Sequence, residues 1–476
     1  MIGLARLGGP VACLGLALLL VAGSRRDRLA GLGFAMLGGC LLAASLAPDK
    51  PAELAGGLAA ALAVAVALAA VFRLVPWLFP AIVLACIPIR VGALGHQLLV
   101  PIYVAIAGAV VLFAWQLAHG DARVRELGLA AWPLAALVGW TGLSLAWSQD
   151  VHEGAIEVLA FYVPFTMLAL VVARLPWSRL GARALYAEAA VMAIIFAAVG
   201  FYQYNTRNVF ENPKVINSNA YAAYFRVNSV FWDPSVYGRF LVVAMVPSIV
   251  LLARGRSVRL QLAAAAAVIV TWFGLLISFS QSSFAALLVA TIAVAAVAWR
   301  WRALLAVALV GIVLAAIAVS APQIRRSIEH HTKSGLNSAT SGRASLVANG
   351  IRIAVAHPVI GVGVGGFKHA YAARVDLKGK APKTAASHDT PVTVAAETGV
   401  VGLGLFAWLV VAVLLPGYRR LDRRLVSRAA LVAAVALTAI LVHSLFYSDF
   451  FEDPTTWLLV GLVALAASKG VKEAPA

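Results

Sequence analysis

The stretch LAGGLAAALAVAVALAAVF (residues 54–72) has no charged side chain, and LQLAAAAAVIVTWFGLLISF (residues 260–279) has the same character later in the chain. Each is about as long as the ~20 residues that a helix needs to cross the ~30 Å hydrocarbon core of a bilayer. Further stretches of this kind occur along the chain. We therefore predict a bundle of helices in lipid, where each helix satisfies its own backbone hydrogen bonds.

The composition agrees with this prediction. The 476 residues are 62% hydrophobic and only 12% charged, whereas soluble proteins carry about 25% charged residues. The apolar stretches together predict an all-α, polytopic membrane protein with about 12 to 15 transmembrane helices. Residues 1–22 are expected to form the first of them, and the segments near residues 76–90 are short or interrupted by proline.

The charges are arranged in turns between the apolar stretches. The chain has 38 Lys and Arg against 20 Asp and Glu, a net charge of +18, and basic turns alternate with less basic ones. The positive-inside rule places the basic turns and the C-terminus in the cytoplasm. Nucleic acid is not an expected partner, because the charge is scattered between apolar spans. The basic turns are Arg25–Arg28, Arg73, Arg123–Arg125, Arg174–Arg183, Arg254–Arg259, Arg300–Arg302 and Arg419–Arg428.

Two long polar segments interrupt the pattern, and both are expected on the outer side. The second has ten basic and three acidic residues, which suggests an anionic ligand at the membrane surface; attraction to anionic headgroups is the alternative. The sequence thus divides into N-terminal helices (1–202), a first outer loop (203–239), central helices (240–320), a large helical non-cytoplasmic loop (321–396) and C-terminal helices (397–476).

Within the large loop, residues 342–357 are expected to form a helix with an apolar stripe that Pro358 ends. The run GVGVGGF (residues 361–367) then follows. It formally matches a dinucleotide-binding fingerprint, but no βαβ unit surrounds it. A tight turn packed on the membrane bundle is the better interpretation.

Arg226 lies just before the chain returns to the membrane, ahead of an Asp233-Pro234 pair that is typical of a helix start. Its guanidinium could grip a diphosphate with a fork of donors. The alternative is an arginine that extends its charge to the membrane surface.

His388 lies at the second return, beside Asp389. A histidine there can take a proton from a sugar hydroxyl or orient it. The alternative is a surface histidine near a helix start. A hydrolase triad is not expected, because no nucleophile elbow is present. No cluster has the spacing of metal ligands, so neither a metal nor another cofactor is expected.

Taken together, three stretches resemble the family of O-antigen ligases and O-antigen polymerases. The segment that begins at Arg226 (RVNSVFWDPS) is similar to the family's Arg-x-x-Gly-x-Phe-x-(Asp/Asn)-Pro-Asn element. HPVIGVG (residues 357–363), which follows Ser341-Gly-Arg343, is similar to its His-Pro-Leu-x-Gly-x-Gly run. Ser-His-Asp (residues 387–389), followed by ETGVVGL (residues 397–403), is similar to its Ser-His-Asn and Glu-x-Gly-x-x-Gly-Leu elements.

The resemblance implies a metal-independent glycosyltransferase of the bacterial inner membrane. Its donor would be an oligosaccharide on undecaprenyl diphosphate, used at the periplasmic face. By position, Arg226 would hold the diphosphate and His388 the acceptor hydroxyl, with Asp389 beside it. Arg343 would contact phosphate or hold the loop helix.

The sequence departs from the family at one turn. Many members have an arginine in a Ser-Arg-Gly turn, where this chain has Ser280-Gln281-Ser282. Gln281 can donate hydrogen bonds but has no charge. Arg239 and Lys214 are therefore candidates for the missing cation.

Several alternatives stay open. A polymerase extends a lipid-linked repeat unit and a ligase transfers the chain to a lipid A core; we lean slightly towards a polymerase. A transporter of lipid-linked saccharides would explain the spans without bond chemistry, and transfer to protein is a third alternative. The expected partners are the donor, the acceptor glycan, membrane lipids and a regulator of chain length.

Overall fold

The computed structural model describes residues 1–46, 51–93, 96–210, 212–221, 225–255, 257–299, 305, 343–375, 386–419 and 425–468. Within these ranges, ten helices have the length and apolar composition to cross a membrane, and three shorter apolar helices accompany them. The predicted all-α polytopic class is confirmed.

The elements follow each other with short connections. The N-terminal ones are α1 (Ile2–Val21), α2 (Arg25–Leu46), α3 (Pro51–Leu74), α4 (Leu78–Cys86), β1 (Val91–Ala93), β2 (His96–Leu98), α5 (Val100–Ala118), the 3-10 helix η1 (Gly128–Ala130), α6 (Ala131–Ser144), the 3-10 helix η2 (Leu145–Trp147), α7 (Val151–Glu157), the π-helix η3 (Val158–Tyr162) and α8 (Val163–Ala173). The remaining ones are α9 (Arg179–Thr206), α10 (Pro213–Tyr221), α11 (Pro234–Arg254), α12 (Val258–Ser278), α13 (Gln281–Trp299), α17 (Arg343–Ala356), α18 (Phe367–Arg374), α19 (Thr390–Arg419), α20 (Leu425–Ser444) and α21 (Pro454–Ala467).

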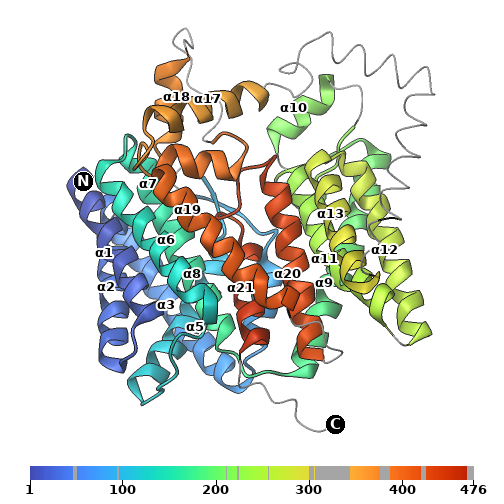
Figure 1. Cartoon of the computed structure of the whole chain (residues 1–476), viewed down its shortest axis with the longest axis horizontal. Helices are drawn as coiled ribbons and strands as arrows, with labels where there is room; N and C mark the ends of the chain where they lie inside the picture. The colour runs from blue at the N-terminus through green and yellow to red at the C-terminus, as the bar shows by residue number, and fades with distance from the viewer. Residues whose placement is uncertain are drawn as a thin grey trace.

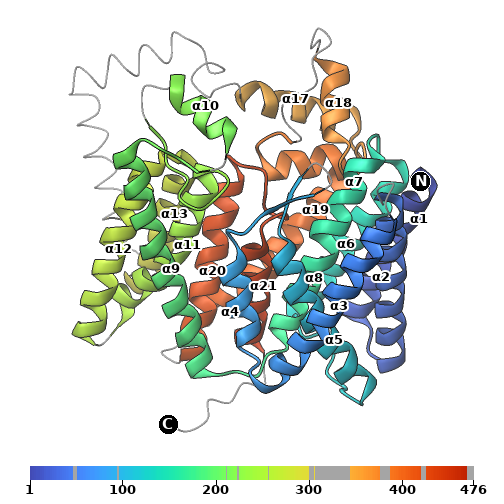
Figure 2. The ribbon, with the colours of Figure 1, turned by 180° about the vertical axis from the view of Figure 1, so that it is seen from behind.

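The long helices run up and down in one bundle (Figures 1 and 2). The C-terminal helices lie in the middle: α19 and α21 contact α6 and α8 on one side, and α20 contacts α11 and α13 on the other. The short helices α10, α17 and α18 lie beyond one end of the bundle in both views. We call this the loop end, and the opposite end, where the basic turns connect the helices, the basic end.

Helix starts follow from local chemistry. Asp150, Ser178, Asp233 and Asp453 each accept a hydrogen bond from a backbone N–H in the first turn of the helix that follows. A proline comes directly after Asp233 and after Asp453, where its missing N–H costs nothing. Such caps satisfy backbone donors that would otherwise be unpaired near the membrane. The predicted helix start at Asp233 is confirmed.

The segment with several prolines near residues 76–90 forms only the short helix α4. The chain then makes a small antiparallel hairpin in which Val91 pairs with Leu98. This hairpin leads directly into α5 and ends the run of unbroken N-terminal spans.

The glycine run is a tight turn against the bundle, as expected. Gly361, Gly363 and Gly365 have φ values of 68°, 86° and 73°, which favour glycine. Their segment also pairs with α19, because the N–H of Gly363 donates to the carbonyl of Glu397 (2.8 Å). On the other side, the Ser148 hydroxyl donates to the carbonyl of Val364 (2.7 Å). The turn therefore fixes the large loop to both α7 and α19.

Helix α19 is broken at Gly399, where φ is 70° and ψ is −171°. The next N–H, that of Val400, donates to the carbonyl of Pro358 (2.8 Å) rather than within the helix. A Cβ at position 399 would lie 2.1 Å from the carbonyl oxygen of Val359. Glycine is thus required here by both conformation and space.

We expect Gly399→Ala to destabilise the protein by at least about 2 kcal/mol, because it adds backbone strain to a clash with backbone atoms. Thermal unfolding in detergent measures this. Gly404→Ala in the same helix is the control, since a Cβ there meets nothing within 4 Å; it should be neutral or slightly stabilising. Equal behaviour of the two variants would contradict the prediction.

Candidate functional site

Four segments that are distant in sequence meet at the loop end. They are the segment leading into α11, the turn between α12 and α13, the segment leading into α19, and the connection from α20 to α21. Each brings polar side chains to a bundle whose core is otherwise apolar. Such groups must be hydrogen-bonded or paired, or serve a function.

Arg226 is half-buried and lies against the turn between α12 and α13. Its Nε donates to the carbonyl of Ser278 (3.2 Å). Its backbone N–H and carbonyl both bind the Asn219 side-chain amide of α10, at 3.0 and 2.8 Å. The turn ends at Gln281, the exposed first residue of α13. The structure thus brings the Arg226 segment to the turn in which the family resemblance expects a second arginine.

His388 lies in the turn before α19, in a left-handed conformation with φ of 63°. A residue other than glycine in this conformation is strained, and such strain often occurs at functional sites. The imidazole is half-buried, with its ring centroid 6.1 Å from that of Tyr447. Burial, and then the nearby Arg343 guanidinium, hold the pKa of His388 below its usual range, while Asp233 acts in the opposite direction.

The turn around His388 is held by hydroxyls. The Ser387 hydroxyl donates to the carbonyl of Asp389 (2.8 Å), and the Asp389 carboxylate accepts the N–H of Val392 (2.9 Å) as a cap of α19. Burial raises the pKa of Asp389, and the Val392 N–H opposes this. The Thr393 hydroxyl lies 3.0 Å from that of Ser448. Asp389 therefore positions the turn, and the turn is joined to the connection between α20 and α21.

Tyr447 is at the centre of this cluster. Burial, followed by the charges of Asp233 and Asp449, raises the pKa of its phenol. Its ring centroid is 5.7 Å from that of His443, at the end of α20. His443 is fully buried, and within the described residues neither of its ring nitrogens has a hydrogen-bond partner.

Arg239 is only 5% exposed and faces two carboxylates. Its guanidinium is paired with Asp449, and its Nε lies 2.9 Å from the carboxylate of Asp453. These pairs join the first turns of α11 to the connection between α20 and α21. Lys214, in contrast, lies exposed on α10 beyond the bundle.

Sequence reasoning missed several of these residues. Tyr447, Asp449 and Asp453 lie in a short acidic turn, and the Asp-Pro pair at 453–454 repeats the signal of the pair at 233–234. Arg90, which precedes the hairpin, acts electrostatically on both Tyr447 and Asp449. No sequence signal indicated Arg90, because only the fold brings it here.

Arg90 also lines a small cavity of about 160 Å³ with Gln97 and the segment Ser229–Trp232. Its Nη1 donates to the carbonyl of Gln97 (3.3 Å). Arg90 thus lies along the segment that begins at Arg226. Across the part of the chain with described coordinates, no group of three or more His, Cys, Asp or Glu side chains is arranged to hold a metal ion.

The fold and this cluster define a multi-pass α-helical membrane protein with a polar site at the loop end. Residues 265–407 match the family model described as O-antigen ligase. The resemblance to O-antigen ligases and polymerases is thereby confirmed, and the match indicates a glycosyltransferase of that type. A comparison with curated proteins gives no match.

The matched region covers only part of the site. It contains the four predicted residues from Gln281 to Asp389, while the three from Lys214 to Arg239 precede it. The connection between α20 and α21, with Tyr447, follows it. The cluster around His388 is therefore built from residues inside and outside the region that identifies the family.

We expect Arg239→Gln to destabilise the protein by roughly 3–5 kcal/mol, because it leaves two carboxylates buried without their cation. Unfolding in detergent by heat or denaturant measures the loss. Arg259→Gln is the matched control: the side chain is exposed at the start of α12, so its loss should cost less than about 0.5 kcal/mol. A loss as small for Arg239 as for Arg259 would show that the pairs do not brace the bundle.

Proposed function

We propose that this protein is a membrane glycosyltransferase that moves a glycan from undecaprenyl diphosphate to an acceptor hydroxyl. The observation that carries the proposal is the strained, half-buried His388, held in a polar cluster inside the region that matches the O-antigen ligase family. The cluster offers a base, a set of cations and an apolar surrounding, which together suit transfer of a group from a charged lipid carrier.

His388 acts as the general base in this proposal. It takes the proton of the acceptor hydroxyl as that oxygen forms its bond to the anomeric carbon of the donor. The bond from this carbon to the diphosphate oxygen breaks, and the electron pair leaves with the diphosphate. The proximity of Arg343 supports this role, because a cation near the imidazole keeps it neutral and able to accept a proton.

Arg226 holds the leaving diphosphate in this proposal, and Arg90 is the second cation. Both lie along the segment that leads into α11. Arg90 fills the role that the sequence left open at Gln281. Arg239 is the less suitable candidate, since two carboxylates already match its charge. Lys214 stays a candidate for contacts with donor sugars, because it is exposed above the bundle.

We infer that the site faces the periplasm in a bacterial inner membrane. The basic turns connect helices at the opposite end of the bundle, and the positive-inside rule places them in the cytoplasm. No contact in the structure separates a lipid-linked repeat unit from a lipid A core as acceptor, so polymerase and ligase both remain within the proposal. The acceptor offered in the assay decides between them: a ladder from the repeat unit alone indicates a polymerase, and transfer only to added lipid A core indicates a ligase.

We expect His388→Ala to lower transfer by roughly 10²–10⁴-fold and Arg226→Ala by roughly 10²–10³-fold. Purified protein in nanodiscs, given a lipid-diphosphate-linked oligosaccharide and an acceptor, is followed by gel and mass spectrometry. Arg259→Gln, exposed at the basic end, should keep full activity. Full transfer by folded His388→Ala would remove His388 from the mechanism. No transfer by the wild type, together with flipping of the lipid-linked sugar, would favour a transporter.

The pH profile gives a sharper test of the base. The neutral imidazole is the active form, so activity should fall as the pH drops through the pKa of His388. Arg343→Gln removes the cation that lowers this pKa and should move the acid limb of kcat/KM to higher pH. Asp233→Asn keeps a helix-capping side chain but removes the opposing charge, so the limb should move to lower pH. Limbs that stay in place in both variants would contradict the assignment.

A further inference from the structure

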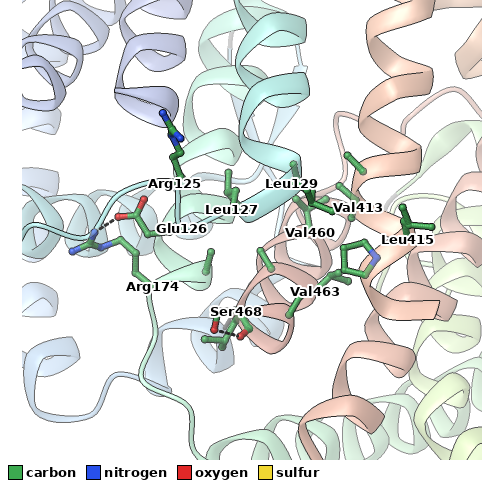
Figure 3. A pocket seen from close by; sticks show the side chains of 18 of the residues that line it. Arg125, Glu126, Leu127, Leu129, Arg174, Val413, Leu415, Val460, Val463 and Ser468 are labelled. Atoms are coloured by element: carbon green, nitrogen blue, oxygen red, sulfur yellow. Dashed lines mark hydrogen bonds and ion pairs between the residues drawn. The ribbon is translucent and has the colours of Figure 1, made fainter. Parts of the chain in front are cut away.

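A cavity of about 790 Å³ opens at the basic end, far along the bundle from His388 (Figure 3). Its walls are η1, the last turn of α8, and the last turns of α19 and α21. This volume is in the range of roughly 300–1,000 Å³ that is typical of sites for small ligands. The proposed glycosyl transfer does not use it.

The cavity has an apolar side and a charged side. Figure 3 shows Leu129, Val413, Leu415, Val460 and Val463 gathered on one side, while the charged side chains lie on the other. The apolar side is formed by helices that cross the membrane. A ligand that fills this cavity should therefore combine hydrocarbon with a polar group.

The interior cations on the charged side are already matched. Arg174 is paired with Glu126, as Figure 3 shows, and lies 2.6 Å from the carboxylate of Asp121. Arg123 shares Asp121 at 2.6 Å, and Arg28 lies 2.9 Å from Glu126. This network leaves no carboxylate oxygen clearly directed at further cations, so it braces the turn before η1 rather than serving the cavity.

Two further arginines of the lining are exposed. Arg125 stacks over Trp132 at 5.9 Å from its ring centroid, and Arg419 ends α19. In the described ranges of the chain, neither has a carboxylate within ion-pair distance, unlike Arg123 and Arg174. The cavity therefore combines an excess of positive charge with a hydrocarbon wall.

We propose that this cavity binds an anionic phospholipid of the cytoplasmic leaflet, with its phosphate at Arg125 and Arg419 and an acyl chain against Val413 and Val463. Basic pockets between transmembrane helices on this side of a membrane recognise anionic headgroups. Free phosphate would leave the apolar wall uncovered, and a zwitterionic lipid would leave the positive charge unmatched. The site is independent of the proposed glycosyl transfer.

The lipid would bridge two helices that also build the polar cluster. α19 begins two residues after His388, and α21 begins after Asp453, which pairs with Arg239. Their last turns form the cavity wall. A bound lipid therefore holds together the ends opposite the site.

The test is a titration of the purified, delipidated full chain with phosphatidylglycerol and with phosphatidylcholine, followed by native mass spectrometry. The wild type should bind phosphatidylglycerol in preference. Arg125→Gln combined with Arg419→Gln should weaken this binding by roughly 30-fold, at about fivefold for each arginine. Ala467→Trp, at a half-buried position of the lining, should exclude the lipid by filling the space.

The matched control is Arg26→Gln combined with Arg259→Gln, which removes the same charge from exposed positions at the basic end that do not line the cavity. It should keep the preference for phosphatidylglycerol. Equal binding of the two lipids by the wild type, or equal loss in the control, would overturn the proposal, as would competition by inorganic phosphate alone. Thermal unfolding of every variant without lipid confirms that it is folded.

Discussion

The guanidinium of Arg239 is buried against Asp449 and Asp453, and this contact sets the geometry of the loop end. A cation inside a bundle of apolar helices is costly unless carboxylates match it, and the same holds for each carboxylate without the cation. The three residues therefore keep α11 and the connection between α20 and α21 in one arrangement. That arrangement places Asp233, ahead of α11, and Tyr447, after α20, on the two sides of His388.

The membrane-spanning fold could be predicted because hydrocarbon allows few solutions. An apolar stretch of sufficient length must be a helix, and its ends are marked by basic turns or by capping residues such as Asp233. The short α4 and the hairpin after it were not predictable in detail. Their residues are apolar but interrupted by proline, and only contacts with other helices decide which conformation they adopt.

The site was predictable only where its residues lie in a recognisable local pattern. Arg226 and His388 stand next to turns whose sequence is informative. Tyr447, His443 and Arg90 have no such neighbours, and they reach the site because distant helices pack together. Arg239 shows the opposite case: its sequence position suggested a free cation, and only the fold reveals that carboxylates match it. The region that matches the family thus supplies the histidine, while the rest of the chain supplies much of its environment.

The left-handed backbone of His388 sets stability against activity at one residue. An imidazole at φ of 63° is held in place by the hydroxyl network of Ser387 and Thr393, and this conformation costs about 1–3 kcal/mol for a residue other than glycine. Glycine at this position would relax the backbone and make the protein harder to unfold while removing the base. A selection for thermal resistance alone would therefore drive the chain towards an inert protein at this position, and directed evolution of this scaffold needs a screen for turnover as well as for folding.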